Sequence, residues 1–332
     1  MKNHIYRPRT LTEQIASGAP ILVEGGRSET LRREFPSLLD PHVGETALLF
    51  HDEGRQVLAG LIRSHLDVGR DYGFPMLLGT PSFRAGPERL ERAGLEGLAD
   101  VNAACVRFAQ DIRSEYGPYA DRIFIGGYMS CRGDAYRPRE GLSEEAAETW
   151  HRPQAEALAS AGVDFLWAVT LPAAPEALGL ARAMAATGLP YGLGYLVRPS
   201  GKLLDSTALH QVVKSIDDRI VPRPLFSIVN CVHPRVAEQA LEREWRADPD
   251  LTKRLIGIMA NASSLPPEEL DNLPYMDSEA PRSLAEQLVR LHRRFGFTIL
   301  GGCCGTDPRL LAWTARLLTT GHPDTRRTPA VP

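Results

Sequence analysis

The chain of 332 residues lacks the features that mark several large classes of protein. It has no apolar run close to the roughly 18 residues that a membrane-spanning helix needs, and its first twenty residues contain no apolar core typical of a signal peptide. Its net charge is only −3, so we expect neither nucleic acid nor a membrane surface as a partner. Its five cysteines, two of them adjacent, do not form the pattern of a secreted disulfide framework. We therefore expect a cytoplasmic protein, because thiols stay free in that reducing compartment.

The two adjacent cysteines near the C-terminus are the most informative feature of the sequence. Cys303 and Cys304 lie in Ile-Leu-Gly-Gly-Cys-Cys-Gly-Thr-Asp-Pro, between a strand-like run and a helix start, and Cys231 follows a similar apolar run. Three thiolates at the ends of buried strands leave one position open around a metal ion, which is typical of catalytic zinc. The pair alone also fits a strained disulfide or two ordinary buried thiols. Cys105 lies in a helical pattern and is expected in the core, whereas Cys131 lies in a loop and has no assigned role.

Short apolar runs alternate along the chain with amphipathic helical stretches. The runs are continuously apolar, which is typical of strands covered on both faces in a parallel sheet. Eight units of strand and helix predict a single (β/α)8 TIM barrel of class α/β, with an open doubly wound sheet as the alternative. We expect one barrel domain over residues 1–332, with 1–18 as an N-terminal extension and 320–332 as a flexible tail. The expected strands are 21–24, 76–80, 122–126, 164–170, 191–196, 225–231, 255–261 and 297–302, and the helical stretches include 87–115, 143–161, 175–187 and 283–295.

Polar residues gather where the expected strands end. Active sites of such barrels lie at the C-terminal ends of the strands. Strands six and eight open to the same mouth, so we expect Cys231 to meet Cys303 and Cys304 there. The same ends carry our candidates for substrate binding, which are Glu24, Gly25, Gly26, Thr80, Thr170 and Asn230.

Two loops at this end are long enough to shape a site. The loop after the third strand carries Arg132, Arg137 and Arg139, which could clamp a carboxylate because a guanidinium binds it with two hydrogen bonds. A solvated basic loop is the alternative. The acidic, proline-containing stretch 264–281 is a candidate lid or a simple surface excursion.

With these motifs the chain resembles the homocysteine S-methyltransferase family, which includes betaine–homocysteine and S-methylmethionine–homocysteine methyltransferases. The resemblance extends over nearly the whole chain. Its most specific elements are Gly-Gly-Cys-Cys-Gly-Thr-Asp-Pro at 301–308 and Val-Asn-Cys at 229–231, with weaker ones at 24–26, 79–83, 161–166 and 205–207. It implies a barrel enzyme in which Cys231, Cys303 and Cys304 hold Zn²⁺ and the zinc activates a thiol for methylation. The implied acceptor is homocysteine, giving methionine, and the implied donor is an onium compound of the S-methylmethionine, S-adenosylmethionine or betaine type.

The chain departs from the family pattern where the acceptor is recognised. Family members typically have aspartate at the place of Glu24, and glutamate at the place of Val169, directly before Thr170. The resemblance implies that those two acids bind the amino group of homocysteine. An ammonium facing Val169 would lose a charge-assisted hydrogen bond worth about 1.5–3 kcal/mol. Methyl transfer by the same mechanism to a different thiol therefore stays open.

Two other classes of function also stay open. In a non-catalytic zinc or thiol-redox protein, Cys303 and Cys304 would cycle between dithiol and vicinal disulfide. In a barrel lyase or hydrolase, Glu24 and the arginine clamp would act and the cysteines would be incidental. One zinc per chain, lost in the variant Cys231→Ser, would favour the methyltransferase. Oligomeric state is not predicted by the sequence.

Overall fold

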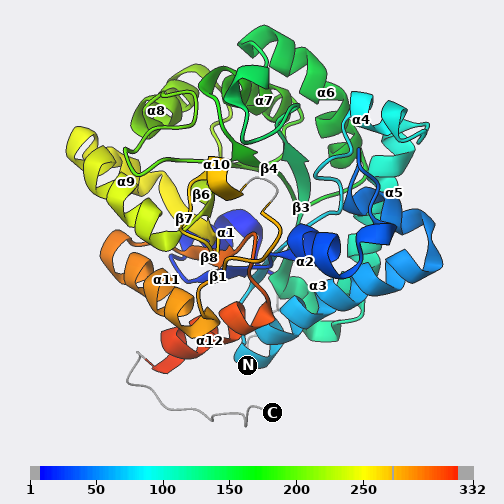
Figure 1. The fold of residues 1–332 in the computed structure, drawn as a ribbon, viewed down its shortest axis with the longest axis horizontal. Coiled ribbons are helices and arrows are strands. Elements are labelled where there is room, and N and C mark those ends of the chain that lie inside the picture. Colours follow the sequence, from blue (N-terminus) through cyan, green and yellow to red (C-terminus); the bar gives the residue numbers. More distant parts are fainter. Residues whose placement is uncertain (1–7, 271–272, 321–332) are drawn as a thin grey trace, which may run out of the picture.

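Eight parallel strands form a closed barrel in the computed structural model, which describes residues 8–270 and 273–320. The strands pair in sequence order, and β1 closes the barrel against β8 (Figure 1). Their side chains are almost all buried, as expected for a parallel sheet covered on both faces. The predicted (β/α)8 barrel is confirmed, and the open doubly wound sheet is excluded. The strands are β1 (Ile21–Val23), β2 (Met76–Gly79), β3 (Ile123–Ser130), β4 (Phe165–Leu171), β5 (Tyr191–Tyr195), β6 (Phe226–Val232), β7 (Leu255–Ala260) and β8 (Ile299–Gly302).

Helices cover the outside of the barrel between successive strands (Figure 1). The predicted helical stretch 87–115 is divided into α4 and α5, because Gly94 and Gly97 between them have positive φ angles of 66° and 77°. The other three predicted stretches each form one helix. The helices are α1 (Leu11–Ala16), α2 (Arg27–Glu34), α3 (Asp52–Tyr72), α4 (Pro87–Arg92), α5 (Leu98–Ser114), α6 (Glu144–Ser160), α7 (Ala174–Ala185), α8 (Leu209–Arg219), α9 (Pro234–Ala247), α10 (Pro267–Leu270), α11 (Pro281–Phe295) and α12 (Pro308–Thr320). Short 3₁₀ segments are η1 (Pro36–Leu38), η2 (Glu45–Phe50), η3 (Gly117–Arg122), η4 (Pro138–Glu140) and η5 (Pro249–Lys253).

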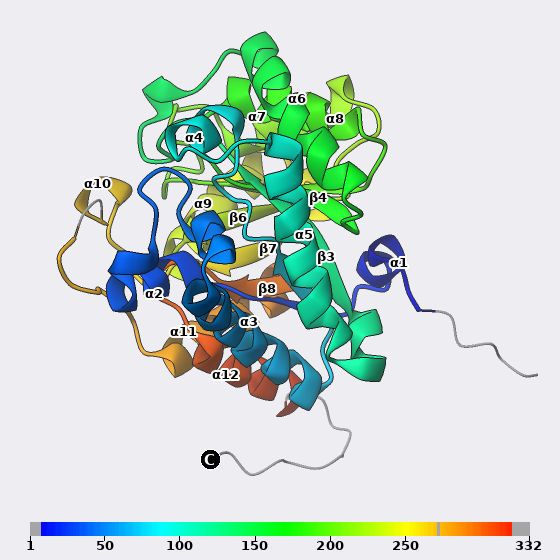
Figure 2. The same cartoon turned by 90° about the vertical axis from the view of Figure 1, so that its right-hand side faces the viewer.

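The inside of the barrel is filled at one end and hollow at the other. Phe165, Trp167 and Phe226 form an aromatic cluster in the interior, with ring centroids 5.7–5.9 Å apart. Leu11 and Ile15 of α1 pack into the same interior cluster. Figure 2 shows α1 at one end of the barrel, opposite α2 and α10. The N-terminal end of the barrel is therefore closed by α1, which leaves the C-terminal mouth for chemistry.

The structure describes only part of the two expected chain ends. Much of the expected extension 1–18 is the helix α1, which begins with a capping box between Thr10 and Glu13 and packs under the barrel. Residues 1–7, and nearly all of the expected flexible tail 320–332, lie outside the described residues. Among the helices that the structure describes, none has the length and apolar character needed to cross a bilayer.

Candidate metal centre and active site

Two strand ends at the C-terminal mouth bend away from regular pairing. The register of β4 shifts between Ala168 and Leu171, and that of β6 shifts between Asn230 and Val232. Thr170 and Cys231 lie at these shifts with φ angles of 61° and 53°, which side-chain-bearing residues rarely adopt. The Asn230 side chain joins the two bends, because its Oδ1 accepts a 2.6 Å hydrogen bond from the Thr170 backbone N–H. Backbone strain of this kind is typical of functional sites.

Cys303 and Cys304 are presented by a tight turn directly after β8. The Cys303 N–H donates to the Ala260 carbonyl at 2.7 Å, and the Ala262 N–H donates to the Cys304 carbonyl at 3.0 Å. The backbone N–H and hydroxyl of Thr306 both donate back to the Cys303 carbonyl, at 3.2 and 2.7 Å. These bonds fix the cysteine pair to the end of β7 and to its own helix start.

The glycines after β1 bring a second backbone segment against this turn. A Cβ added to Gly25 would lie 1.9 Å from the Gly302 carbonyl oxygen, and one added to Gly26 would lie 1.9 Å from the Thr306 carbonyl oxygen. Gly26 also has a φ angle of 80°. Only glycine allows the two backbones to approach this closely. Both residues therefore support the cysteine turn, in addition to lining the cavity above it.

The three predicted cysteines come together at the mouth of the barrel. Their sulfur atoms all lie within 4.8 Å of one another, and those of Cys231 and Cys304 are 3.6 Å apart. Tetrahedral zinc with Zn–S bonds of about 2.3 Å requires sulfurs about 3.8 Å apart, so the cluster fits such an ion. The Cys303 and Cys304 thiols lower the pKa of Cys231 by hydrogen bonding to it. The Asn261 amide donates to the Cys231 sulfur as well, at 3.5 Å.

A deep cavity of about 600 Å³ opens from the three sulfurs to the surface. A cavity of this volume can hold small molecules in contact with the three sulfurs. Tyr136, from the loop after β3, places its hydroxyl 4.0 Å from the Cys231 sulfur. The proximity of Cys231, together with burial, raises the pKa of Tyr136. Sequence analysis did not identify Tyr136, because nothing in a loop sequence reveals which side chain turns inward.

Most of the predicted substrate-binding residues reach this cavity. Thr80 does not line it: the residue is fully buried, and its Oγ1 is occupied by the Ser82 hydroxyl at 2.7 Å and by the Tyr128 N–H at 2.9 Å. The structure thus gives Thr80 a role in joining β2 to β3, which corrects the sequence prediction. The predicted residues that line the cavity are Glu24, Gly25, Gly26, Thr170, Asn230, Cys231, Cys303 and Cys304.

The three arginines of the loop after β3 do not form the possible carboxylate clamp. Arg132 forms an ion pair with Glu88 at 3.0 Å, and Arg137 is exposed beside Asp134 and Glu140. None of the three arginines lines the cavity, so the alternative of a solvated basic loop holds.

The remaining features of the sequence have simpler outcomes. Cys105 is fully buried in α5, as predicted, and Cys131 is 3% exposed with its sulfur near the Gly133 carbonyl. Part of the stretch 264–281 lines the cavity through Leu273, Tyr275 and Met276, while residues 271–272 lie outside the described residues. The segment therefore borders the mouth, as a lid would.

The fold is a closed (β/α)8 barrel, and three clustered thiols at its C-terminal mouth open into a cavity for small molecules. These features define a barrel enzyme with a sulfur site suited to a metal ion. Comparison with known proteins identifies the family. The model for homocysteine S-methyltransferases matches residues 21–318, so the chain belongs to the homocysteine S-methyltransferase family and is a methyltransferase.

Individual relatives have low sequence identity to this chain, but the similarity covers most of each chain. The chain is 26% identical over 250 residues to a homocysteine S-methyltransferase of Escherichia coli (strain K12), covering 70% of this chain and 76% of the relative. It is 23% identical over 318 residues to betaine–homocysteine S-methyltransferase 1 of Danio rerio, covering 90% and 73%. The metallated form of the homocysteine methyltransferase MmuM from Escherichia coli has a similar fold, with a TM-score of 0.70 at 23% identity, covering 91% of this chain and 98% of that one.

Proposed function

We propose that this protein is a zinc-dependent S-methyltransferase that moves a methyl group from an onium donor to a thiol bound at Cys231, Cys303 and Cys304. The observation that carries the proposal is the three-sulfur cluster at the base of a cavity in a barrel of the homocysteine S-methyltransferase family. Five cysteines that are all free thiols fit a reducing compartment such as the cytoplasm. We also propose that residues 1–332 act as one barrel domain.

The three cysteine ligands suit zinc, the proposed metal. Three thiolates prefer a soft ion and leave a fourth tetrahedral position for another sulfur. Zinc bound there would supply a positive centre that keeps an incoming thiol deprotonated at neutral pH. The Asn261 amide donates to the Cys231 sulfur at 3.5 Å, so it would orient and stabilise the Cys231 thiolate as a ligand.

The methyl transfer itself needs orientation more than acid or base catalysis. The acceptor sulfur, having released its proton, supplies the electron pair for the new bond to the methyl carbon. The bond between that carbon and the onium sulfur or nitrogen of the donor breaks, and its electrons remain on the donor. Holding both reactants in line in one cavity supplies a large part of the barrier reduction for such a step. The rings of Tyr128 and Tyr136, which line the cavity, can face a cationic methyl group.

Homocysteine is the proposed acceptor, with methionine as the product, because the family and both curated relatives are named for it. The proposed donors are S-methylmethionine, S-adenosylmethionine and betaine. We expect protein supplied with zinc to form methionine from homocysteine and at least one of these donors, detected by mass spectrometry. A chelator should abolish the reaction, and zinc should restore it. The proposal would be refuted if folded, zinc-loaded protein formed no methylated thiol with any of these donors.

A further inference from the structure

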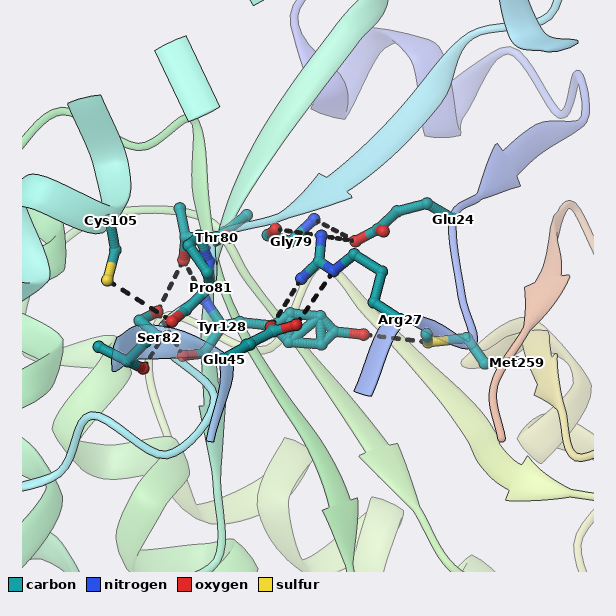
Figure 3. A network of polar contacts seen from close by, with 12 residues as sticks. Glu24, Arg27, Glu45, Gly79, Thr80, Pro81, Ser82, Cys105, Tyr128 and Met259 are labelled. Atoms are coloured by element: carbon teal, nitrogen blue, oxygen red, sulfur yellow. Dashed lines mark hydrogen bonds and ion pairs between the residues drawn. The ribbon is translucent and has the colours of Figure 1, made fainter. Parts of the chain in front are cut away.

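A buried ion cluster lies beside the acceptor cavity and was not visible in the sequence. Arg27, the first residue of α2, turns inward and is only 7% exposed. Its guanidinium donates to Glu24 Oε1 at 2.6 Å, to the Gly79 carbonyl at 3.0 Å, and to both oxygens of Glu45 at 2.9 and 3.3 Å (Figure 3). Arg27 therefore lies between two buried carboxylates and binds both.

This arrangement leaves Glu24 poorly suited to bind a cation. Its Oε1 already accepts from Arg27 and from the Gly79 N–H, the latter at 3.2 Å. Its Oε2 is buried and has no hydrogen-bond partner among the described residues. Burial raises the pKa of Glu24 to about 7. A carboxylate whose charge is already paired with a guanidinium offers an incoming ammonium only its Oε2, and the positive charge of Arg27 beside it weakens the attraction.

Among the described residues, the deep wall of the cavity has no buried carboxylate without an arginine partner. Val169, at the end of β4, lines the cavity with Met259 and Tyr128, and all three are buried and apolar or aromatic. Six carboxylates line the cavity in the described part of the chain, but only Glu24 and Glu45 are buried, and Arg27 binds both. The other four, Glu29, Asp40, Asp134 and Asp277, are half-buried or exposed and each accepts a hydrogen bond.

We infer that Arg27 is a specificity-determining residue, because its guanidinium is paired with the Glu24 carboxylate. The acceptor of this enzyme is then a thiol that is recognised without an α-ammonium group. The inference rests on the proposed thiol methyl transfer and narrows its substrate class. Homocysteine still binds through its sulfur, but its amino group gains no ion pair at this wall. A mercaptocarboxylate of the same length, 4-mercaptobutyrate, is therefore used at least as well.

The test compares homocysteine with 4-mercaptobutyrate as acceptors, using zinc-loaded protein and a saturating donor. We expect the two kcat/KM values of the unmodified enzyme to agree within about threefold, whereas an ammonium ion pair would favour homocysteine by roughly 10- to 100-fold. Val169→Glu should raise the preference for homocysteine about tenfold or more, chiefly through KM. Val169→Gln, with the same shape and no charge, is the matched control and should not.

A second variant tests Arg27 itself. Replacing Arg27 alone would leave two buried carboxylates unpaired and can unfold the protein. The double variant Arg27→Met with Glu45→Gln removes one charge of each sign and leaves Glu24 without its guanidinium partner. An incoming ammonium would then be the cation that keeps Glu24 ionised, so the preference for homocysteine should also rise. Each variant is first checked by circular dichroism, and only folded protein is compared.

Binding can be measured without turnover, which separates this inference from the proposed function. Protein loaded with Co²⁺ is titrated with each thiol, and the sulfur-to-cobalt absorption gives a Kd for each. Comparable Kd values for the two thiols support the inference even if no donor is found. A Kd or kcat/KM that favours homocysteine by more than about threefold in the unmodified enzyme overturns it, as does an equal effect of Val169→Glu and Val169→Gln.

Discussion

Replacing Gly25 by alanine should weaken metal binding without changing any of the three cysteine ligands. The new Cβ would lie 1.9 Å from the Gly302 carbonyl oxygen, whereas real Cβ atoms essentially never come within 3.0 Å of a non-bonded heavy atom. The two segments must therefore separate by about 1.1 Å, which is 3.0 minus 1.9. Both sides of the contact are backbone, so no flexible side chain can move aside. Gly302 directly precedes Cys303, and metal–ligand distances tolerate only about 0.2 Å.

We expect zinc affinity of the Gly25→Ala variant to fall by roughly 100-fold, the upper range for loss of a supporting contact around a metal. Competition with a chromophoric chelator measures it. Gly60→Ala is the control, because Gly60 lies within α3 and an added Cβ would have no neighbour within 4 Å. That change should leave zinc affinity unchanged. A folded Gly25→Ala variant that binds zinc as tightly as the unmodified protein would refute the packing argument.

Three further changes test other parts of the site. Tyr136→Phe removes the hydroxyl 4.0 Å from the Cys231 sulfur, so kcat/KM should fall up to about tenfold while the melting temperature stays unchanged; equal kinetics would deny the hydroxyl a role. Asn230→Ala leaves the Thr170 N–H without its partner and should lower the free energy of unfolding by about 1–3 kcal/mol in urea titrations. The raised pKa of Glu24, about 7 in the folded protein against 4.5, means that the folded state holds this proton more tightly than the unfolded state. Its contribution to stability is thus lost as pH rises from 4.5 through 7, and the unmodified protein should lose up to about 3 kcal/mol relative to Glu24→Gln over that range; parallel stability curves would contradict the raised pKa.

Much of the fold is predictable because strand order follows from local pattern. Continuous apolar runs mark buried parallel strands, and each predicted strand overlaps an observed one. The largest error is β3, which runs to Ser130 because Gly126 to Ser130 continue to pair with β4. Glycines in a strand read as an end in sequence, although their pairing is decided by the neighbouring strand.

The cysteine cluster is predictable for a similar reason. Cys231, Cys303 and Cys304 follow strands whose ends must share one mouth, so topology alone brings them together. The bent backbone at Cys231 is not predictable, because it depends on a register shift against β7.

Sequence reasoning fails most at the deep wall of the cavity, where Arg27 is bound to Glu24. Arg27 looks like an exposed helix-start residue, yet it is buried because Glu24 and Glu45 meet it from two different segments. Such a cluster forms only when separate segments of the chain meet in the folded structure, so it leaves no periodic pattern in the sequence. The same holds for Tyr136, which sequence analysis passed over in favour of the neighbouring arginines.

The account depends on one claim above all, that Cys231, Cys303 and Cys304 together bind a single zinc ion. Metal analysis of the purified protein by inductively coupled plasma mass spectrometry tests it directly, with Cys105→Ser as the control, because Cys105 is buried in α5 away from the cluster. We predict about one zinc per chain in the unmodified protein and the control, and none in folded Cys231→Ser. A folded and active protein without stoichiometric metal, or a Cys231→Ser variant that keeps its zinc, would contradict the account.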